Sequence, residues 1–164
     1  MYTRADIQEP KAVATWAQEK VNQLQKRLEQ FPKVEMPLRH LFTPGMYVRE
    51  ITMPAGTAVV SHVHKTEHPF VISKGSVTVW TERYGVMMPS NLSAPYTGIT
   101  TPGTRRVLYV HEETIWTTFH AGPWSADMPM EQLESCLVDK VDLSHLEKFS
   151  ADLVGSGKVG EVSL

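Results

Sequence analysis

The fold class is set by the stretch from Gly56 to Gly75, which reads GTAVVSHVHKTEHPFVISKG. Its β-branched residues are typical of a β-strand. On a strand, residues i and i+2 point to the same face, so His62 and His64 would direct their rings toward one point. His68 follows shortly afterwards, where a turn can bring a third ring to the same place. Three neutral imidazoles that converge in this way form a good site for a divalent transition metal.

Two other interpretations of these histidines compete with the metal site. A helical zinc site would use His64 and His68 at a spacing of four residues, but Pro69 and the surrounding β-branched residues argue against a helix. A histidine can also be an ordinary polar residue on a solvated strand, and a single histidine usually deserves that interpretation. Three histidines at these spacings favour the metal site.

The composition fits one globular domain with extensions. The chain has 164 residues, of which 41% are hydrophobic and 21% charged, and its formal net charge is −2. These values are ordinary for a globular protein, and they give no electrostatic footprint for nucleic acid. No apolar run approaches the length of a membrane span, and the first residues lack the apolar core of a secretion signal. Cys136 is the only cysteine. We therefore expect a cytoplasmic protein without nucleic-acid or membrane partners.

The chain from Leu38 to His120 has the pattern of strand-like runs and turn residues that is typical of an all-β domain. Short runs rich in Val, Ile, Thr and Tyr alternate with Gly and Pro. Many short strands at close spacing are typical of a sandwich or barrel, and no long helical pattern suggests a parallel βαβ fold. The candidate strands are residues 46–53, 58–64, 70–73, 76–81, 86–88, 98–101, 105–110 and 115–120. Turns are expected at 54–56, 74–75, 83–85, 89–91, 102–103 and 111–114.

Helices are expected on both sides of this region. Residues 10–31 carry an apolar stripe with three- and four-residue steps, and Pro32 ends the pattern. This helix either covers one side of the core or pairs with a second copy. Two shorter helices are expected at 130–138 and 144–153, followed by a flexible tail at 155–160. The expected limits are 1–37 for the N-terminal helical extension, 38–122 for the barrel and 123–164 for the C-terminal extension.

The glycine and histidine spacing resembles the first motif of the cupins, which are small antiparallel jelly-roll barrels. That motif runs Gly, five residues, His-x-His, three or four residues, Glu, six residues, Gly. Here Gly56 stands before the His62 and His64 pair at the required distance, and Gly75 closes the frame. His68 stands where the family usually has Glu. The resemblance implies a cupin jelly-roll barrel with metal ligands at His62, His64 and His68.

The segment Pro102-Gly103-Thr104-Arg105-Arg106 resembles the second cupin motif shortened by one residue. Arginine stands near the usual place of a fourth ligand histidine, and His120 is expected to substitute for it. If residues 105–110 and 115–120 form a hairpin across the loop 111–114, His120 lies opposite Arg105 and shares its face. Which face this is depends on the register, because a one-residue slip inverts it. The alternative for His120 is a strand-end histidine that is hydrogen-bonded to a neighbour.

Residues 38–120 also resemble a group of uncharacterised cupin-like proteins carried by bacteriophages and prophages. The resemblance lies in residues 45–51, 64–68, 94–97, 102–106 and 115–120. In that group the pattern centres on the equivalents of His64, His68 and His120, while the His62 position is variable. The resemblance implies the fold and a metal-type site, and it leads us to expect a homodimer, as in many cupins. It implies no reaction.

Three further residues are candidates for catalysis. Glu67 is one place from the carboxylate position of the first motif and could accept a proton from a metal-bound water. Its alternative is a solvent-facing residue on the connecting turn. Arg105 and Arg106 could bind an anionic substrate bidentately, or they could be rim charges paired with Glu112 or Glu113.

The sequence leaves two functional classes open. The first is a small metalloenzyme that acts on a small polar or anionic substrate. The second is a non-catalytic ligand-binding or phage accessory protein, with a structural metal or none. An all-histidine site without thiolate suits Zn, Ni, Fe, Cu or Mn, so the ligand set does not choose the metal. His40, His111 and His145 are interpreted as surface residues.

Overall fold

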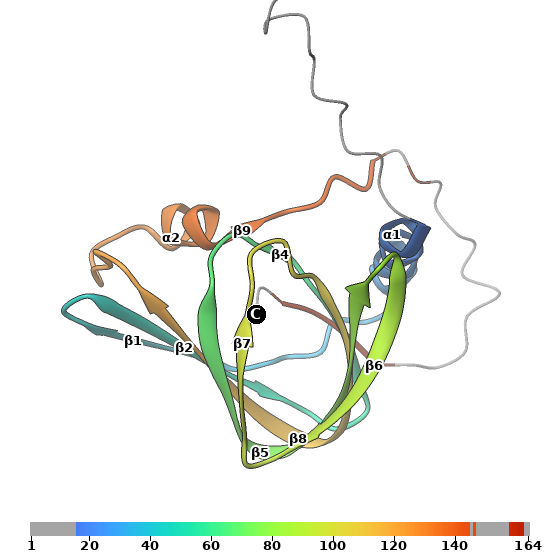
Figure 1. The fold of residues 1–164 in the computed structure, drawn as a ribbon, viewed down its shortest axis with the longest axis horizontal. Helices are drawn as coiled ribbons and strands as arrows, with labels where there is room; N and C mark the ends of the chain where they lie inside the picture. The colour runs from blue at the N-terminus through green and yellow to red at the C-terminus, as the bar shows by residue number, and fades with distance from the viewer. Residues whose placement is uncertain (1–15, 145, 147–157, 163–164) are drawn as a thin grey trace, which may run out of the picture.

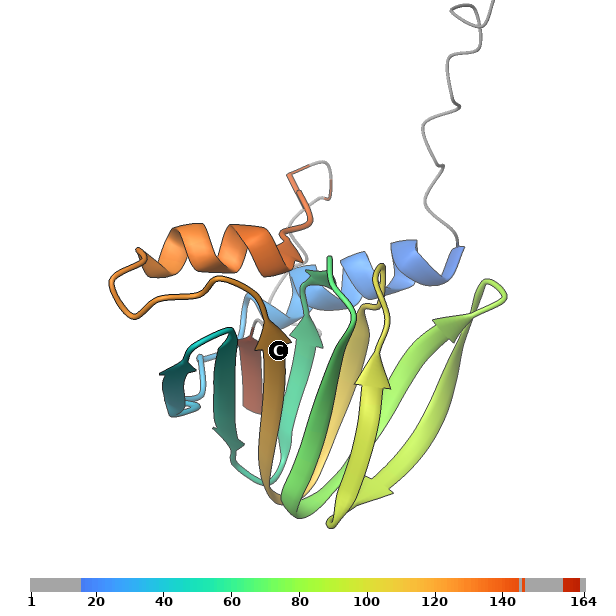
Figure 2. The same ribbon diagram turned by 60° about the vertical axis from the view of Figure 1, so that its left-hand side comes forward.

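The computed structural model describes residues 16–144, 146 and 158–162, which form a curved sheet with helices at one end. Figure 1 shows the strands curling around a common interior, and Figure 2 shows both helices lying across the same end of the strands. The predicted all-β architecture with an N-terminal helix and a short C-terminal helix is confirmed. The elements are α1 (Trp16–Leu28), β1 (Leu38–Thr43), β2 (Met46–Met53), β3 (Thr57–Ser61), β4 (Val63–His64), β5 (His68–Arg83), β6 (Val86–Ser93), β7 (Tyr96–Thr100), β8 (Arg106–Ala121), α2 (Met130–Leu137), β9 (Val138–Asp139) and β10 (Lys158–Val162).

Two long strands organise the sheet. β5 and β8 have 16 residues each and pair antiparallel along most of their length. The first part of β5 also pairs with β7 and its second part with β6, while β8 pairs with β2 and β3. Each long strand therefore belongs to two neighbouring parts of the sheet, which is how a strand turns the corner of a barrel. β4 and β9 form a separate two-stranded sheet.

A bulge bends β5 at Gly75, where a turn was predicted. The register between β5 and β8 shifts between Ile72 and Val77. Gly75 has a φ of +87°, and a Cβ atom there would lie 2.3 Å from the carbonyl oxygen of Glu113. Only glycine tolerates both the positive φ and the close approach of the facing strand. The prediction of a chain reversal at Lys74-Gly75 is therefore wrong, because the strand kinks here and continues.

The predicted hairpin loop at residues 111–114 is also wrong. β8 runs without interruption from Arg106 to Ala121. The polar residues that suggested a loop lie on its exposed side, where the Lys74 ammonium contacts the Glu113 carboxylate at 2.7 Å and Ser76 donates a hydrogen bond to Glu112. As a consequence, His120 does not lie opposite Arg105.

Three smaller differences concern the sheet edges. β6 continues through Pro89, where a turn was predicted; β6 pairs only with β5, and an edge strand tolerates a residue without N–H. β1 was not predicted, and it pairs with β2 at the other side of the sheet. Residues 158–160, predicted to be flexible, belong to β10, which pairs parallel with β3. The helices predicted before residue 16 and across residues 147–153 lie outside the described residues.

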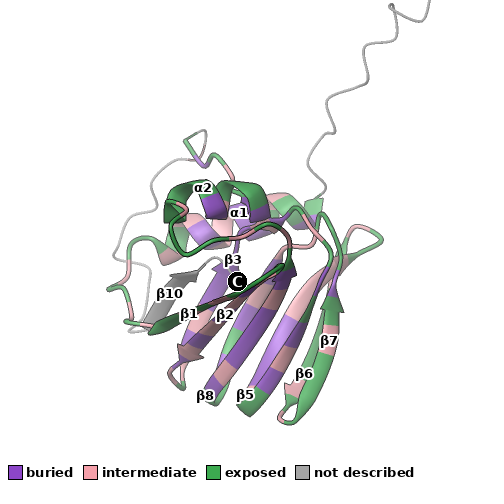
Figure 3. Cartoon of the chain, turned by 90° about the vertical axis from the view of Figure 1, so that its left-hand side faces the viewer, coloured by how far each residue is buried: buried purple, intermediate pink, exposed green. Residues whose placement is uncertain are grey.

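The apolar core lies between the two long strands and their neighbours. Figure 3 shows β8 and β5 carrying much buried surface, whereas β6 and β7 are largely exposed. The main cluster consists of Ile51, Met53, Val59, Phe70, Ile72, Val77, Val79, Leu108, Val110 and Trp116. A second cluster joins Tyr47 of β2 to Leu133 and Leu137 of α2. α2 therefore packs against the end of the sheet that carries Tyr47.

Neither helix in the described part of the chain has the length and apolar character needed to cross a membrane. α1 follows the predicted stripe in part, since Ala17 and Val21 are buried. Two polar residues of α1, Asn22 and Gln25, are buried as well. The reason is a barrel arginine that binds their side chains, as described below.

Candidate metal centre

Three histidines from three strands meet in the interior of the barrel. His64 lies on β4, His68 begins β5 and His120 lies near the end of β8. Their exposed fractions are 1%, 2% and 4%. The ring centroids of His64 and His68 are 5.0 Å apart, and those of His68 and His120 are 4.3 Å apart. The register explains the second contact: Phe70 pairs with Thr118, so two residues further along the antiparallel ladder His68 faces His120.

Hydrogen bonds fix which ring nitrogen carries the proton in two of these residues. Nδ1–H of His68 donates to the carbonyl oxygen of Thr66 at 3.0 Å, so its Nε2 carries the lone pair. The Thr118 hydroxyl donates to the carbonyl of Arg49 at 3.4 Å and accepts from Nε2–H of His120 at 3.0 Å. His120 therefore carries its lone pair on Nδ1. Such hydrogen bonds from the remote nitrogen are what orient metal-binding histidines.

Four imidazole nitrogens in this group are buried and have no hydrogen-bond partner among the residues that the structure describes. They are both nitrogens of His64, Nε2 of His68 and Nδ1 of His120. A buried polar atom without a partner costs about 1–3 kcal/mol. Two of these atoms, Nε2 of His68 and Nδ1 of His120, are the nitrogens that carry the lone pair in the tautomers given above. The donor chemistry of this group therefore suits a metal ion.

All three histidines are neutral at ordinary pH. Burial, followed by electrostatic repulsion that His68, Arg106, His120 and His62 exert on a protonated ring, lowers the pKa of His64 to about 2. Burial, with the charges of His68 and Arg49, lowers the pKa of His120 to about 3. Burial also lowers the pKa of His68. Metal ligands must be deprotonated, so a site that keeps imidazole neutral favours metal over protons.

The ring orientations do not yet converge on one point. The planes of His64 and His68 are inclined by 58°, and those of His68 and His120 by 44°. Within residues 16–144, 146 and 158–162, no group of three or more His, Cys, Asp or Glu side chains is arranged so that it could hold a metal ion. The donor set fits a metal, whereas the rings have to turn about their side-chain bonds to bind one.

His62 lies next to this group. It is buried between β3 and β4, and its charge is one of those that lower the pKa of His64. His62 and His64 are buried whereas Val63 between them is half-buried, which agrees with the expected alternation along an extended chain. The role of His62 as a ligand stays a prediction.

Arg106 lies inside the barrel, near the histidines. It is 7% exposed, its Nη2 donates to the Thr100 hydroxyl at 3.0 Å, and its guanidinium lies 5.3 Å from the centroid of the Phe70 ring. Its charge lowers the pKa of His64 and His68. Burial lowers the pKa of Arg106 itself to about 10. In the described part of the chain this guanidinium has no carboxylate partner.

Arg105 points away from the histidines, toward helix α1. Its Nη1 donates to Oδ1 of Asn22 at 2.5 Å, its Nη2 donates to Oε1 of Gln25, and its Nε donates to the carbonyl of Ser61 at 3.3 Å. The two arginines therefore have different neighbours, although they are adjacent in the sequence. Arg105 holds the helix against the barrel, and only Arg106 lies near the histidines.

The remaining sequence candidates lie elsewhere. Glu67 is exposed in the loop between β4 and β5, so its role as a proton acceptor stays a prediction. His111 is exposed on β8 and shares a hydrogen bond with the Thr78 hydroxyl at 2.6 Å. His40 is half-buried, and its Nδ1 lies 2.7 Å from the Tyr47 hydroxyl.

Two buried residues of β2, Tyr47 and Arg49, lie beside His120, a position that the sequence did not predict for them. The Tyr47 ring stacks on the His120 ring at 5.7 Å, and Arg49 is 3.6 Å from the carboxylate of Glu134 on α2. The charge of Arg49 helps to lower the pKa of His120. The alternation of β2 could have predicted their burial, because Tyr47 and Arg49 fall on the same face of the strand as the core residue Ile51.

Comparison with known proteins gave structural likenesses only. No protein-family model matches the chain, and no curated protein matches it. It is similar to an RmlC-like cupin family protein with a double-stranded β-helix fold from Methanocaldococcus jannaschii (14% identity, TM-score 0.45, 54% of this chain and 82% of that one). It is also similar to a cupin-2 domain containing protein from Shewanella frigidimarina (11% identity, TM-score 0.43, 60% and 92%).

A third similar structure is the cobalt(II) form of HppE in complex with substrate, at 6% identity and a TM-score of 0.43. The match covers 51% of each chain, so this chain spans about half the length of that protein. With TM-scores below 0.5, these likenesses carry no argument about the site. The function is therefore argued below from the residues of this chain alone.

Proposed function

We propose that the barrel interior binds a divalent transition metal through His64, His68 and His120, and that the protein is a small metalloenzyme for a small anionic substrate. The observation that carries this proposal is the set of four buried imidazole nitrogens without hydrogen-bond partners. Zn, Ni, Fe, Cu and Mn all suit an all-histidine site. When bound, the metal would polarise an oxygen atom of the substrate as a Lewis acid.

The three histidines are costly to bury without a metal ion, and a bound metal ion would offset that cost. Each buried polar atom without a partner costs about 1–3 kcal/mol, and three imidazoles are crowded together here. A metal ion would use one lone pair from each ring. The hydrogen bond of His68 to Thr66 and that of His120 to Thr118 already hold these two rings in the tautomers that the metal would bind. The arrangement is costly as a purely structural core and well suited to ligation.

Arg106 supplies the argument for an anionic substrate. A buried guanidinium without a carboxylate partner is destabilising, because burial removes its water. A small carboxylate or phosphate in the barrel would offset that cost, and guanidinium binds such groups through paired N–H donors. Arg106 would hold the anion beside the histidines, and the Phe70 ring under the guanidinium would keep it in place. Arg105 is not assigned to this site, because its side chain is directed toward α1 and away from the histidines.

The number of ligands bears on catalysis. Three protein ligands leave coordination positions open for water or substrate, as catalytic metals require. His62 is the candidate for a fourth ligand, since it is buried two residues before His64 in the same extended segment. A site closed by His62 would suit a non-catalytic role, whereas an open one suits an enzyme.

Elemental analysis by mass spectrometry tests this proposal, using protein purified without an affinity tag. The parent is expected to contain close to one equivalent of one transition metal, and the His64→Ala variant is expected to lose it. The His111→Ala variant is the matched control, because His111 is an exposed histidine whose partner is Thr78. Metal retained in His64→Ala, or lost equally from both variants, would contradict the site. A parent that contains no metal and takes up none would favour the non-catalytic class.

A further inference from the structure

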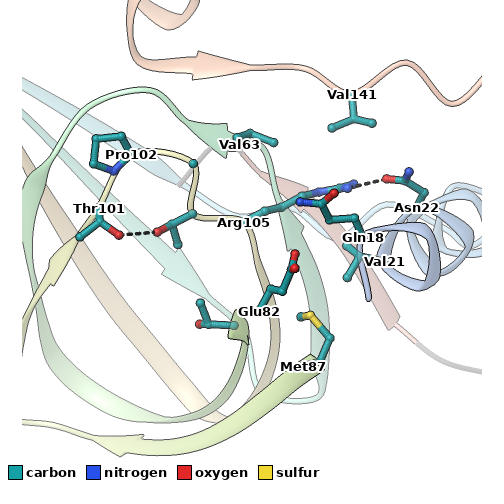
Figure 4. A pocket seen from close by; sticks show the side chains of 13 residues that line it. Gln18, Val21, Asn22, Val63, Glu82, Met87, Thr101, Pro102, Arg105 and Val141 are labelled. Carbon is teal, nitrogen blue, oxygen red and sulfur yellow. Dashed lines mark hydrogen bonds between the residues drawn. The ribbon is translucent and has the colours of Figure 1, made fainter. Parts of the chain in front are cut away.

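Helix α1 and the barrel enclose a pocket that is separate from the histidines. The pocket has a volume of about 480 Å³, within the range of small-molecule sites. Its walls come from α1, from the turn between β7 and β8, and from the neighbouring ends of β5 and β6. Figure 4 shows the side chains that line it. None of His64, His68 and His120 is among them.

Two opposite charges face this pocket. Arg105 lies on one side and Glu82 on another, and Figure 4 shows both side chains directed into the same space. Arg105 uses three of its five N–H groups on the neutral oxygens of Ser61, Asn22 and Gln25. Two N–H groups remain. Within the described residues no carboxylate forms an ion pair with this guanidinium, so its positive charge faces neutral acceptors. The pocket therefore offers a cationic donor and an anionic acceptor to one occupant.

An apolar crevice continues from this pocket along the same helix. It has a volume of about 310 Å³ and is lined by Lys20, Val21, Leu24, Trp80, Met87 and Val107. Val21 and Met87 line both spaces, so the two spaces adjoin. A ligand with a charged head and an apolar tail could therefore occupy both at once.

We propose that this pocket binds a zwitterionic small molecule with an aliphatic tail, of the class of apolar α-amino acids. The ligand carboxylate would bind Arg105, and its ammonium group would bind Glu82. The aliphatic side chain would lie against Val21 and Met87 at the entrance of the apolar crevice. This site lies outside the barrel interior and is independent of the proposed metal centre.

Calorimetric titration of the full-length protein tests the chemistry of the ligand with three matched probes. L-Leucine carries both charges, 4-methylpentanoate lacks the ammonium group, and 3-methylbutylamine lacks the carboxylate. Saturable binding of L-leucine is expected, with affinity at least about tenfold above either analogue, because each analogue lacks one of the two hydrogen-bonded charges. No binding of L-leucine, or equal binding of all three probes, would overturn the proposal.

Variants locate the binding. Met87→Trp fills the junction of the two spaces and is expected to abolish the binding of L-leucine, whereas the neighbouring Met88→Trp, at a residue that lines neither space, should leave it unchanged. Glu82→Gln is expected to remove the preference for L-leucine over 4-methylpentanoate. Arg105 is a poor first target because it also anchors α1. Retained binding in Met87→Trp, or loss in both tryptophan variants with their circular dichroism unchanged, would contradict the assigned position. Metal content plays no part in either result, so this inference and the metal centre can fail separately.

Discussion

The ring of His68 lies 4.3 Å from the ring of His120, measured between centroids, although these residues begin β5 and nearly end β8. The antiparallel pairing of the two longest strands brings them together. The candidate metal group therefore forms only when the sheet has closed. A metal held there would connect distant parts of the chain, and it would stabilise the folded state.

Metal binding should raise the melting temperature. A ligand that binds only the folded state at a hundred times its dissociation constant adds about 2.7 kcal/mol, which is about 5–10 °C for a chain of this size. Calorimetric scans with and without saturating metal would measure this shift. The His120→Ala variant should lose it. The same shift in parent and variant would place the metal elsewhere.

The stability of the metal-free protein should fall as the pH drops below 6.5. The pKa of His64 is lowered to about 2 and that of His120 to about 3, so the unfolded chain binds protons in this range and the folded chain does not. Stability from this source is complete above pH 6.5 and is lost as the pH falls toward the folded pKa values. At pH 5.5 each histidine should cost about 1.4 kcal/mol.

Urea unfolding at pH 7.5 and pH 5.5, with a chelator present, would measure this loss. His64→Leu should reduce the difference between the two pH values. A parent protein whose unfolding free energy is the same at both would argue against buried, neutral histidines.

The Thr118 hydroxyl should support metal binding without touching the metal. It accepts a hydrogen bond from Nε2–H of His120 and so keeps the lone pair on Nδ1. Thr118→Val should weaken metal affinity by about 10–100-fold, as is usual for such outer partners. Thr117→Val is the matched control, because the Thr117 hydroxyl binds Glu50 instead. Competition with a chromophoric chelator would measure both, and equal affinity in the two variants would refute the role of Thr118.

Arg106 should favour anion binding at the expense of stability. A buried guanidinium without a carboxylate partner has lost its water and gained no opposite charge, so an apolar residue of similar length in its place should be neutral or stabilising. Arg106→Met should therefore unfold at an equal or higher urea concentration than the parent, and it should lose stabilisation by added acetate. Arg39→Met is the control, because Arg39 is an exposed arginine beside Glu50. If acetate stabilised Arg106→Met as much as the parent, Arg106 would not be the anion site.

Part of this arrangement could be predicted from the sequence. The spacing of His62 and His64 within a glycine frame predicted two rings on one face of a strand, and His68 was expected to reach them through a turn. All three side chains are buried. His120 was expected in the site through a resemblance. The hairpin that was predicted to bring it there does not form, because β8 is one continuous strand. Glu112 and Glu113 suggest a loop, but they lie on the exposed side of one continuous strand beside the bulge at Gly75.

The sequence could not predict that Arg105 binds helix α1 whereas Arg106 lies near the histidines. Adjacent residues of an extended chain point to opposite faces, and a one-residue change of register exchanges them. Only the structure identifies Arg105 as the residue that binds Asn22 and Gln25. The burial of those two amides on α1 has the same origin. Their burial depends on Arg105, which is distant in the sequence, so no pattern within the helix could have predicted it.

A crystal structure of the protein loaded with cobalt or zinc, with an anomalous difference map, tests the metal centre most directly. We expect one strong peak within about 2.0–2.3 Å of a ring nitrogen from each of His64, His68 and His120, bound through Nε2 of His68 and Nδ1 of His120. The three rings should have turned from their present inclinations toward that peak. A fully loaded crystal whose peaks all lie away from these rings would rule out the metal centre proposed here.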